Sequence, residues 1–253
     1  NWGNFNNAYP YIAIPGHPIA MFYGHIFDGV YQYTDFDKVG ESYILKDGVP
    51  NNGNAREKIQ PGDIKFKDIN RDGMVNDYDL TIIGNPNPKH IGGFGNNFQY
   101  KNFDLNVFFQ WSYGGDVLNA NRIEFEGGDP NARTSLNMFA SFANRWTPEN
   151  QTNELYRIGG QGPAVYSSRT IEDGSFLRLK TISLGYRLPN AWLKKINIKS
   201  LRVYASAQNL ITWTKYSGPD PEVSTRPTAL TPSFDWSPYP RPRTLTLGVD
   251  ISF

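Results

Sequence analysis

Six oxygen-bearing residues between positions 68 and 79 have the spacing of a calcium-binding loop. The segment follows the pattern D-x-[DN]-x-[DN]-G, which supplies the hard oxygen ligands that Ca²⁺ takes in large number. The expected ligands are the side chains of Asp68, Asn70, Asp72, Asn76 and Asp79 and the main-chain carbonyl of Met74. Gly73 permits the sharp turn, and Val75 would anchor the loop in a small core. The sequence therefore predicts a structural Ca²⁺ ion at this loop.

The last ligand position and the flanks of this loop differ from those of an EF-hand. Asp79 stands where an EF-hand has a bidentate Glu, so its shorter carboxylate resembles the closing ligand of dockerin-type loops instead. Residues 63–67 also predict a strand rather than an incoming helix. The alternative is an Asx-rich turn that binds no metal, and the spacing leaves that alternative open.

The remaining residues of catalytic type do not form a recognisable active site. Cysteine is absent, which excludes disulfides and thiolate chemistry. No G-x-S-x-G motif occurs, and residues 92–95 are interpreted as small residues of a strand rather than a nucleotide-binding loop. The three histidines are interpreted as loop or interfacial residues: His17, His25 and His90. Four carboxylates that occur in pairs are interpreted as solvated loop charge: Glu124, Glu126, Asp220 and Glu222. We therefore expect a protein that is not an enzyme.

Composition limits the partners and the means of crossing a membrane. The 253 residues include 25 Lys plus Arg and 24 Asp plus Glu, so no basic excess indicates nucleic acid. The sequence contains no run of about 18 apolar residues, which a transmembrane helix would need. Barrel strands remain compatible with this composition, because each needs only about 9–11 residues of alternating polarity.

Strict alternation of apolar and polar residues predicts several long strands. In residues 244–253 the apolar set is Leu245, Leu247, Val249, Ile251 and Phe253. Residues 93–100, 103–113, 177–188 and 201–208 alternate in the same way, and a weaker strand is expected over 19–31. Lys101-Asn102 predicts a tight hairpin turn, and a change of phase near Lys180 predicts a bulge.

The lengths of the connections distinguish a membrane barrel from a soluble sandwich. Alternation alone fits both architectures equally well. Short links at 101–102 and 189–200 alternate with long ones at 32–89, 114–174 and 214–240. Outer-membrane barrels have short periplasmic turns and long extracellular loops, whereas loops this long are uncommon in compact soluble domains. The predicted fold is therefore all-β and part of an antiparallel transmembrane barrel.

Ordered motifs along the chain resemble the SusC/RagA family of TonB-dependent transporters. The most specific are Gly62–Gly73, Ile83–Lys89 and Gly92–Gly95, followed by Phe103–Tyr113 with Gly114-Gly115. The similarity continues through Gly29–Gln32, Asn144–Pro148, Gly174–Lys180, Asn209-Leu210, Gly218–Glu222 and Arg241–Phe253. It covers nearly the whole chain.

This resemblance implies the fold and the function that we expect. Residues 1–253 would be the C-terminal segment of a barrel of about 22 strands, with the N-terminal plug lying outside this sequence. Residues 62–84 would be a calcium-loop insertion within an extracellular loop. The family imports oligosaccharides or peptides across the bacterial outer membrane, powered by TonB and capped by a SusD-like surface lipoprotein. Residues that contact the substrate follow no transferable motif.

Two other classes of protein remain as alternatives. One is a secreted, soluble β module that is stabilised by calcium and binds glycans, with its aromatic residues as sugar platforms. The other is an autotransporter or adhesin barrel, which the ordered motifs disfavour.

Overall fold

The computed structural model describes the chain except for residues 6, 128–136, 195–196 and 227. It divides into two compact units, each built from separate stretches of sequence. The first unit comprises Asn1–Asn87, Asp116–Glu172 and Val223–Pro238. The second comprises Pro88–Gly115, Asp173–Glu222 and Tyr239–Phe253. Within the described residues, no helix has the length and apolar character needed to cross a membrane.

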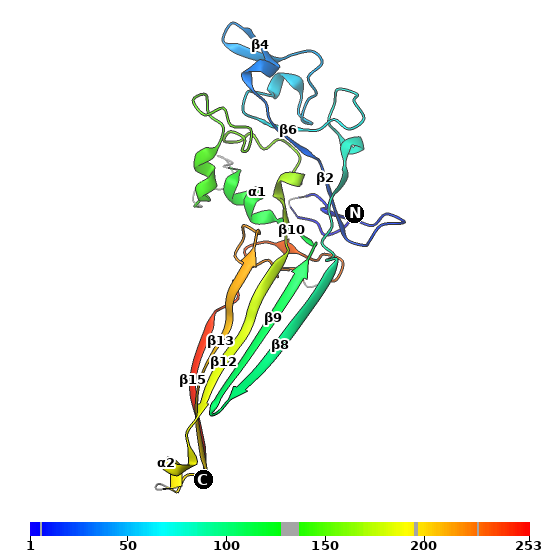
Figure 1. The fold of residues 1–253 in the computed structure, drawn as a ribbon. Helices are drawn as coiled ribbons and strands as arrows, with labels where there is room; N and C mark the ends of the chain where they lie inside the picture. Colours follow the sequence, from blue (N-terminus) through cyan, green and yellow to red (C-terminus); the bar gives the residue numbers. More distant parts are fainter. Residues whose placement is uncertain (6, 128–136, 195–196, 227) are drawn as a thin grey trace. The chain divides into compact units, whose positions relative to one another are not determined.

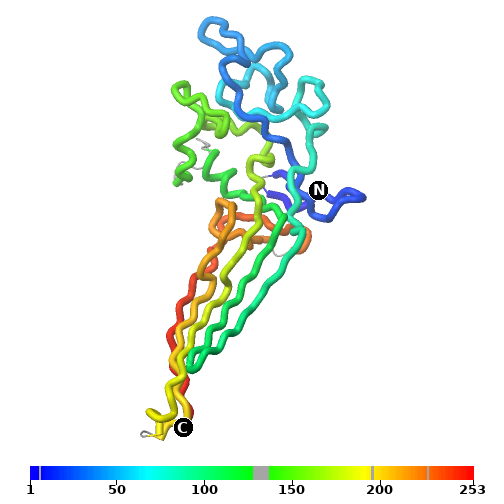
Figure 2. The backbone as a smooth tube through the Cα atoms, in the orientation of Figure 1, coloured from blue at the N-terminus to red at the C-terminus, as the bar shows by residue number. Residues whose placement is uncertain are grey.

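The second unit is a five-stranded antiparallel sheet (Figure 1). Its strands are β8 (His90–Tyr100), β9 (Phe103–Tyr113), β12 (Phe176–Arg187), β13 (Ser200–Thr214) and β15 (Thr244–Ser252). They pair in the order β15-β13-β12-β9-β8, so strands that follow one another along the unit are neighbours in the sheet. Figure 2 shows the red C-terminal segment running beside β13. Strands of 9 to 15 residues are long enough to cross a bilayer when tilted.

The register of the sheet confirms the strands, the hairpin and the bulge that the sequence predicts. Tyr100 pairs with Phe103 across the two-residue turn, in which Lys101 has a φ of 52°. The pairings of β12 with β9 and with β13 both shift between Leu179 and Thr181, which places the bulge at Lys180. The link between β12 and β13 contains the short helix α2 (Asn190–Leu193).

One face of this sheet is apolar and exposed, and we call it the apolar face. On β15 it carries Leu245, Leu247, Val249 and Ile251, of which Leu247 is 85% exposed. Aromatic residues also lie on this face, including Phe103 and Tyr113 at the two ends of β9. A continuous exposed apolar surface of this kind is unfavourable in water and favourable against lipid.

The opposite face, called the polar face, contains an ion pair that crosses a whole strand. Arg202 of β13 reaches over β12 to Asp104 of β9, with Nε–Oδ1 at 2.9 Å and Nη2–Oδ2 at 2.6 Å. Gly185 of β12 lies between them in the register. A Cβ there would lie 2.5 Å from the Arg202 Nε, so glycine leaves the space that the guanidinium occupies. Arg202 also donates to Asp250 of β15 at 3.2 Å.

The described residues of the first unit form short strands, short 3-10 helices and one α-helix. Its strands are β1 (Tyr11–Ile12), β2 (Met21–Gly24), β3 (Phe27–Val30), β4 (Phe36–Val39), β5 (Ser42–Leu45), β6 (Ile64–Phe66), β7 (Thr81–Gly84), β10 (Asp116–Asn119), β11 (Ile171–Asp173) and β14 (Phe234–Asp235). The helix α1 spans Ala120–Glu126. The strands form sheets β1-β2-β7, β11-β10-β14, β3-β6 and β4-β5.

The prediction of one strand over residues 19–31 is wrong. The segment forms two strands, β2 and β3, which belong to different sheets. His25 and Ile26 separate them, and the His25 amide donates to the Tyr166 carbonyl at 3.2 Å. A contact with a residue far along the chain ends the first strand, which local alternation does not reveal.

The long connections fold into compact structure with their own hydrophobic cores. The first core cluster contains Tyr11, Ala20, Phe22, Leu118, Ala120, Ile123, Tyr166 and Phe234. The second contains Val30, Ile64, Phe66, Val75, Trp146, Leu155 and Tyr156. The third contains Tyr31, Phe36, Leu45 and Ile59. Each cluster joins residues from stretches that are distant in sequence or separated by a turn.

Two of the carboxylates interpreted as solvated loop charge are buried in ion pairs, so that interpretation is wrong for them. Glu126 of α1 is 5% exposed and binds Arg122 at 3.0 Å and also Arg169. Burial opposes ionisation, yet the two guanidinium groups hold the pKa of Glu126 below its usual value. These contacts fasten α1 to the segment that precedes β11.

Asp220 is the second buried carboxylate, and it anchors the Gly218–Glu222 segment. It binds Arg178, which lies on the polar face of β12 and is 2% exposed. Arg178 also contacts Glu222 at 3.3 Å, and Arg241 contacts Glu222 at 2.9 Å. Two arginines from different strands and loops therefore hold this segment against the sheet.

A charge on the apolar face distinguishes a lipid-facing sheet from a soluble one. Leu247→Arg in the full-length protein should lower the free energy of unfolding in a bilayer by about 2–4 kcal/mol near the midplane. Thr246→Arg places the same charge on the polar face and should lower the free energy of unfolding by clearly less. Denaturant titration in lipid vesicles measures the free energy of unfolding of both variants. An equal decrease in the two variants, or no decrease in either, would contradict the lipid-facing assignment.

Candidate calcium loop and candidate ligand pocket

The predicted calcium loop lies in the first unit between β6 and β7. The strand expected over residues 63–67 is confirmed as β6, which leads directly into the loop. The loop ends in a single 3-10 turn at Asp77–Asp79, after which β7 begins. The flanks are therefore those of a β protein, and no EF-hand helix pair surrounds the loop.

Side-chain oxygens within the loop accept hydrogen bonds from its own backbone. Asp68 accepts from the amide of Arg71 at 2.6 Å and from that of Gly73 at 2.8 Å. Asp72 accepts from the Met74 amide at 2.8 Å. Gly73 has a φ of 84°, and no atom lies within 4 Å of where its Cβ would be, so conformation rather than space requires the glycine.

Asp79 closes the loop from inside. Its side chain is fully buried. Oδ1 accepts from the Ile69 amide at 2.8 Å, and Oδ2 accepts from the Asn76 amide at 2.9 Å. The Asn76 side chain in turn accepts from the Tyr78 amide at 2.8 Å, which forms a reciprocal cap on the 3-10 turn. One carboxylate thus ties the first residues of the loop to the last.

Val75 anchors the loop in the second core cluster, as the sequence predicts. It is 3% exposed and packs in the same cluster as Phe66 and Trp146. Its amide donates to the Asn51 side chain at 3.0 Å, and the Asn51 amide donates to the Gly73 carbonyl at 3.3 Å. Residues outside the loop therefore hold its turn in place.

The donor chemistry of the loop suits a hard cation, while its side-chain arrangement is that of a hydrogen-bonded turn. All six expected ligands lie on the one loop and offer oxygen. Across the described part of the chain, no three Asp, Glu or His side chains gather closely enough to hold a metal. Within the loop, the carboxylates of Asp68, Asp72 and Asp79 accept hydrogen bonds from backbone N–H groups. Calcium remains a prediction here.

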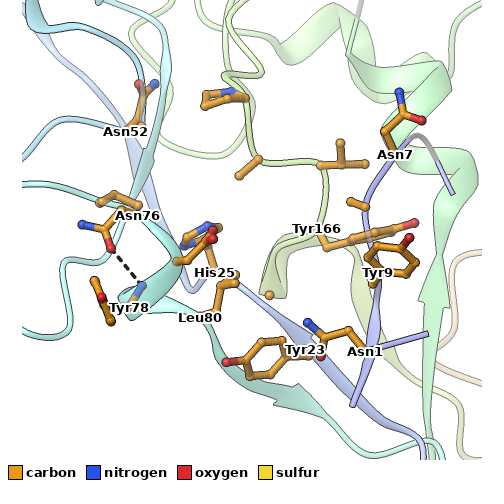
Figure 3. Close-up of a pocket in the computed structure, with 18 residues that line it drawn as sticks. Asn1, Asn7, Tyr9, Tyr23, His25, Asn52, Asn76, Tyr78, Leu80 and Tyr166 are labelled. Carbon is orange, nitrogen blue, oxygen red and sulfur yellow. Dashed lines mark hydrogen bonds between the residues drawn. The ribbon is translucent and has the colours of Figure 1, made fainter. Parts of the chain in front are cut away.

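A pocket of about 970 Å³ lies beside this loop, wholly within the first unit (Figure 3). In this view Asn52, Asn76 and Tyr78 lie on one side and Asn7, Tyr9 and Tyr166 on the other, with His25 and Leu80 between them. The other lining residues are Asn1, Ala8, Tyr23, Gly24, Gly53, Val75, Asp77, Pro163, Ala164 and Val165. Amides and tyrosines thus make up much of the polar lining.

His25 is one of the buried titratable groups of this pocket. It is 8% exposed, and its ring centroid lies 5.3 Å from that of Phe66. Its Nδ1 has no hydrogen-bond partner among the described residues. Burial lowers the pKa of the imidazole, and the carboxylates of Asp79 and Asp77 oppose that shift. The ring is therefore neutral at pH 7.

Close backbone packing sets the wall that carries Tyr166. A Cβ on Gly24 would lie 2.7 Å from the Tyr166 carbonyl oxygen, so the end of β2 can approach this segment only with glycine. The Tyr166 hydroxyl donates to the Phe5 carbonyl at 3.0 Å, and burial raises its pKa, so it stays protonated.

Sequence reasoning did not identify this pocket. Its walls come from residues 1–25, 52–80 and 163–166, which no motif connects. His25 was interpreted as an isolated loop or interfacial histidine. The one local signal is the Gly24-His25 pair after a strand, which does not by itself indicate a site.

Known proteins with similar sequences are TonB-dependent receptors. TonB-dependent receptor P3 of Formosa agariphila is 36% identical over 99% of this chain and 24% of its own length. TonB-dependent receptor SusC of Bacteroides thetaiotaomicron is 33% identical over 78% of this chain and 18% of its own length. No family model matches. The chain spans between 18% and 26% of the length of the curated relatives it matches.

Solved structures of the RagAB peptide transporter have the same fold as this chain. One aligns with a TM-score of 0.68 at 24% identity, over 96% of this chain and 24% of the other. The "open-open" state of the RagAB peptide importer aligns with a TM-score of 0.65 over 99% of this chain. The predicted all-β fold, part of an antiparallel barrel, is confirmed.

The five-stranded sheet and these relatives define a barrel segment of a TonB-dependent receptor. Within that class, the chain belongs to the SusC/RagA family, as its ordered motifs predict.

Two neighbouring aspartates of the 3-10 turn provide a test of the loop closure. Asp79→Asn replaces one acceptor oxygen by a donor that faces backbone N–H groups, which should destabilise the loop by about 1–3 kcal/mol. Asp77→Asn makes the same charge change at an exposed position and should alter stability by less than about 0.5 kcal/mol. Hydrogen exchange of residues 68–79 in the full-length receptor, in the presence of chelator, measures the stability of the loop in both variants. Equal protection in the two variants would show that Asp79 does not close the loop.

Proposed function

We propose that this chain forms part of the barrel wall and surface loops of a receptor that imports nutrient oligomers, glycans or peptides, across the bacterial outer membrane. The observation that carries the proposal is the sheet with an exposed apolar face and a polar face crossed by the Arg202–Asp104 pair. In a barrel the first face would contact outer-membrane lipid and the second would line a wet lumen. Family membership supports TonB as the energy source. Since its relatives are receptors, we infer transport rather than catalysis.

The edges of the sheet support a larger barrel. Within the described residues, β8 and β15 each pair with one strand only. Unpaired strand edges are unfavourable in lipid, where backbone groups have no water to bind. Further strands of the same receptor would cover both edges, in keeping with a complete barrel of about 22 strands.

The partners follow from this placement. A plug domain elsewhere in the receptor would engage TonB, and a SusD-like surface lipoprotein would dock on the extracellular loops. The first unit, built from the long connections, would supply loop surface for that docking and for the substrate. A secreted, soluble glycan-binding module is disfavoured, because the apolar face would then lie in water.

Uptake with and without TonB tests the proposal. Cells that carry the complete receptor should deplete a mixed pool of neutral oligosaccharides and casein-derived peptides from the medium, measured by mass spectrometry. Deletion of the receptor or of TonB should abolish depletion of the same compounds. A receptor-dependent loss that persists without TonB would refute energy-coupled import.

We further propose that residues 62–84 form a calcium-loop insertion in an extracellular loop and that Ca²⁺ rigidifies it. The support is the order of the oxygen donors from Asp68 to Asp79 and the anchoring of Val75 in a core. When bound, the ion would supply fixed positive charge that holds the exposed oxygens of Asp68, Asn70 and Asp72 together.

Calcium binding to the full-length receptor tests this role. Asp72→Asn should weaken Ca²⁺ binding about tenfold or more, since the count of ligand charges sets affinity, whereas Asp77→Asn should leave it unchanged. Isothermal titration measures the affinity, and chelation should speed proteolysis between Asp68 and Asp79. If wild-type receptor neither binds Ca²⁺ nor changes its cleavage on chelation, the loop is a metal-free turn.

A further inference from the structure

The segment that follows β13 folds back over the sheet. Residues 215–222 belong to the same compact unit as the sheet, and so do residues 239–243, which lead into β15. The Thr214 hydroxyl donates to the Ser175 carbonyl at 2.8 Å and accepts from the Tyr216 amide at 3.1 Å. The segment therefore turns toward the start of β12 as soon as β13 ends. We call residues 215–222 the strap.

Burial along β12 shows which face of the sheet the strap covers. Phe176 and Arg178 point to the polar face and are 7% and 2% exposed. Leu177, which lies between them, points to the apolar face and is 39% exposed. On the polar face of β13, farther from the strap, Gln208 is exposed. The strap thus covers the polar face at the end of β12 where the long connection from β9 enters.

Four charged groups and one amide fasten the strap to this end of the sheet. The Arg178 guanidinium binds Asp220 with one nitrogen and Glu222 with another, the second contact at 3.3 Å. Arg241, on the segment that leads into β15, contacts Asp220 at 3.6 Å and Glu222 at 2.9 Å. Gln110 of β9, which pairs with Arg178 in the register, donates to Glu222 at 3.4 Å. Two positive and two negative charges therefore balance in this cluster.

The docked position of the strap depends on Arg178. Asp220 is 8% exposed, and a buried carboxylate that loses its partner is strongly unfavourable. A strap without the guanidinium of Arg178 would therefore leave the sheet so that water could reach Asp220. The strap is also compact in itself, because the buried Tyr216 ring occupies the space that a Cβ on Gly218 would need.

From these contacts, and resting on the import function proposed above, we propose that the strap narrows the lumen and limits the size of the oligomer that enters. In a barrel the polar face lines the lumen, so a segment fastened to that face takes up space that a solute would otherwise use. The strap lies at the end of the sheet from which the long connections leave, which is the extracellular end of the barrel. Arg178, which the strap covers, is a positioning residue that acts by holding Asp220 and Glu222 in the lumen.

Thiol labelling of the full-length receptor tests the size limit. Ser183→Cys places a thiol on the polar face of β12 beyond the bulge, in a chain that has no cysteine of its own. Any cysteine elsewhere in the receptor is replaced. The probes are N-ethylmaleimide and a maleimide coupled to a long polyethylene glycol chain. Arg178→Met should raise the ratio of large-probe to small-probe labelling about tenfold or more, because the strap leaves the wall.

Three further variants separate the strap from general damage to the barrel. Arg202→Met is the matched control, because it also removes an arginine from an ion pair on the polar face, with Asp104 and Asp250 as the partners. It should leave the labelling ratio unchanged. Asp220→Asn combined with Glu222→Gln leaves β12 intact and should raise the ratio as Arg178→Met does. Arg178→Lys keeps the charge and should retain most of the wild-type exclusion. Hydrogen exchange of residues 215–222 should become faster only in the variants that raise the ratio.

Two labelling outcomes would overturn the inference: a ratio that stays at the wild-type value in both the Arg178→Met and the strap variants, or an equal rise in Arg202→Met. Uptake by cells adds a functional measurement. Cells with the Arg178→Met receptor should deplete longer oligomers from the mixed pool than wild-type cells do, and depletion of the same lengths only would also refute the size limit. Depletion by wild-type cells that persists without TonB refutes the import proposal itself, whereas the labelling ratios still decide the role of the strap.

Discussion

Hydrogen bonds between the backbones of five long antiparallel strands organise this structure. Once strands of 9 to 15 residues hydrogen-bond side by side, period-two alternation divides their side chains between an apolar and a polar face. A bilayer accepts such strands because every backbone group inside the sheet is satisfied. The bulge at Lys180 changes the phase of β12 without breaking its pairing with either neighbour.

Glycines on the sheet make room for large side chains that extend across from a neighbouring strand. Gly185 lets Arg202 cross β12 to reach Asp104, and Gly248 leaves the space that the Tyr204 ring occupies. Gly92 does the same for the Trp111 ring on the apolar face. The glycine-rich stretch at residues 92–95 is thus explained by packing against the neighbouring strand, in agreement with its interpretation as part of a strand.

The first unit shows how long connections can be ordered without long strands. Three hydrophobic clusters and buried ion pairs such as Glu126 with Arg122 and Arg169 hold it together. The predicted calcium loop belongs to this framework through Val75 in one cluster and Asp79 in a closed hydrogen-bond network. The pocket beside it then takes its walls from segments that the same framework brings together.

Local sequence is sufficient to predict the features that depend on neighbouring residues: the alternating strands, the Lys101-Asn102 turn, the bulge, and the order of oxygen donors from Asp68 to Asp79. Its ordered motifs also determined the family. The packing of distant segments is needed to explain three other features. Residues 19–31 split into two strands, Glu126 and Asp220 are buried, and His25 lines a pocket together with Tyr9 and Tyr78. The physical reason is distance along the chain. Alternation and turn chemistry act within a few residues, whereas burial and pocket walls arise when stretches about forty to more than a hundred residues apart pack together.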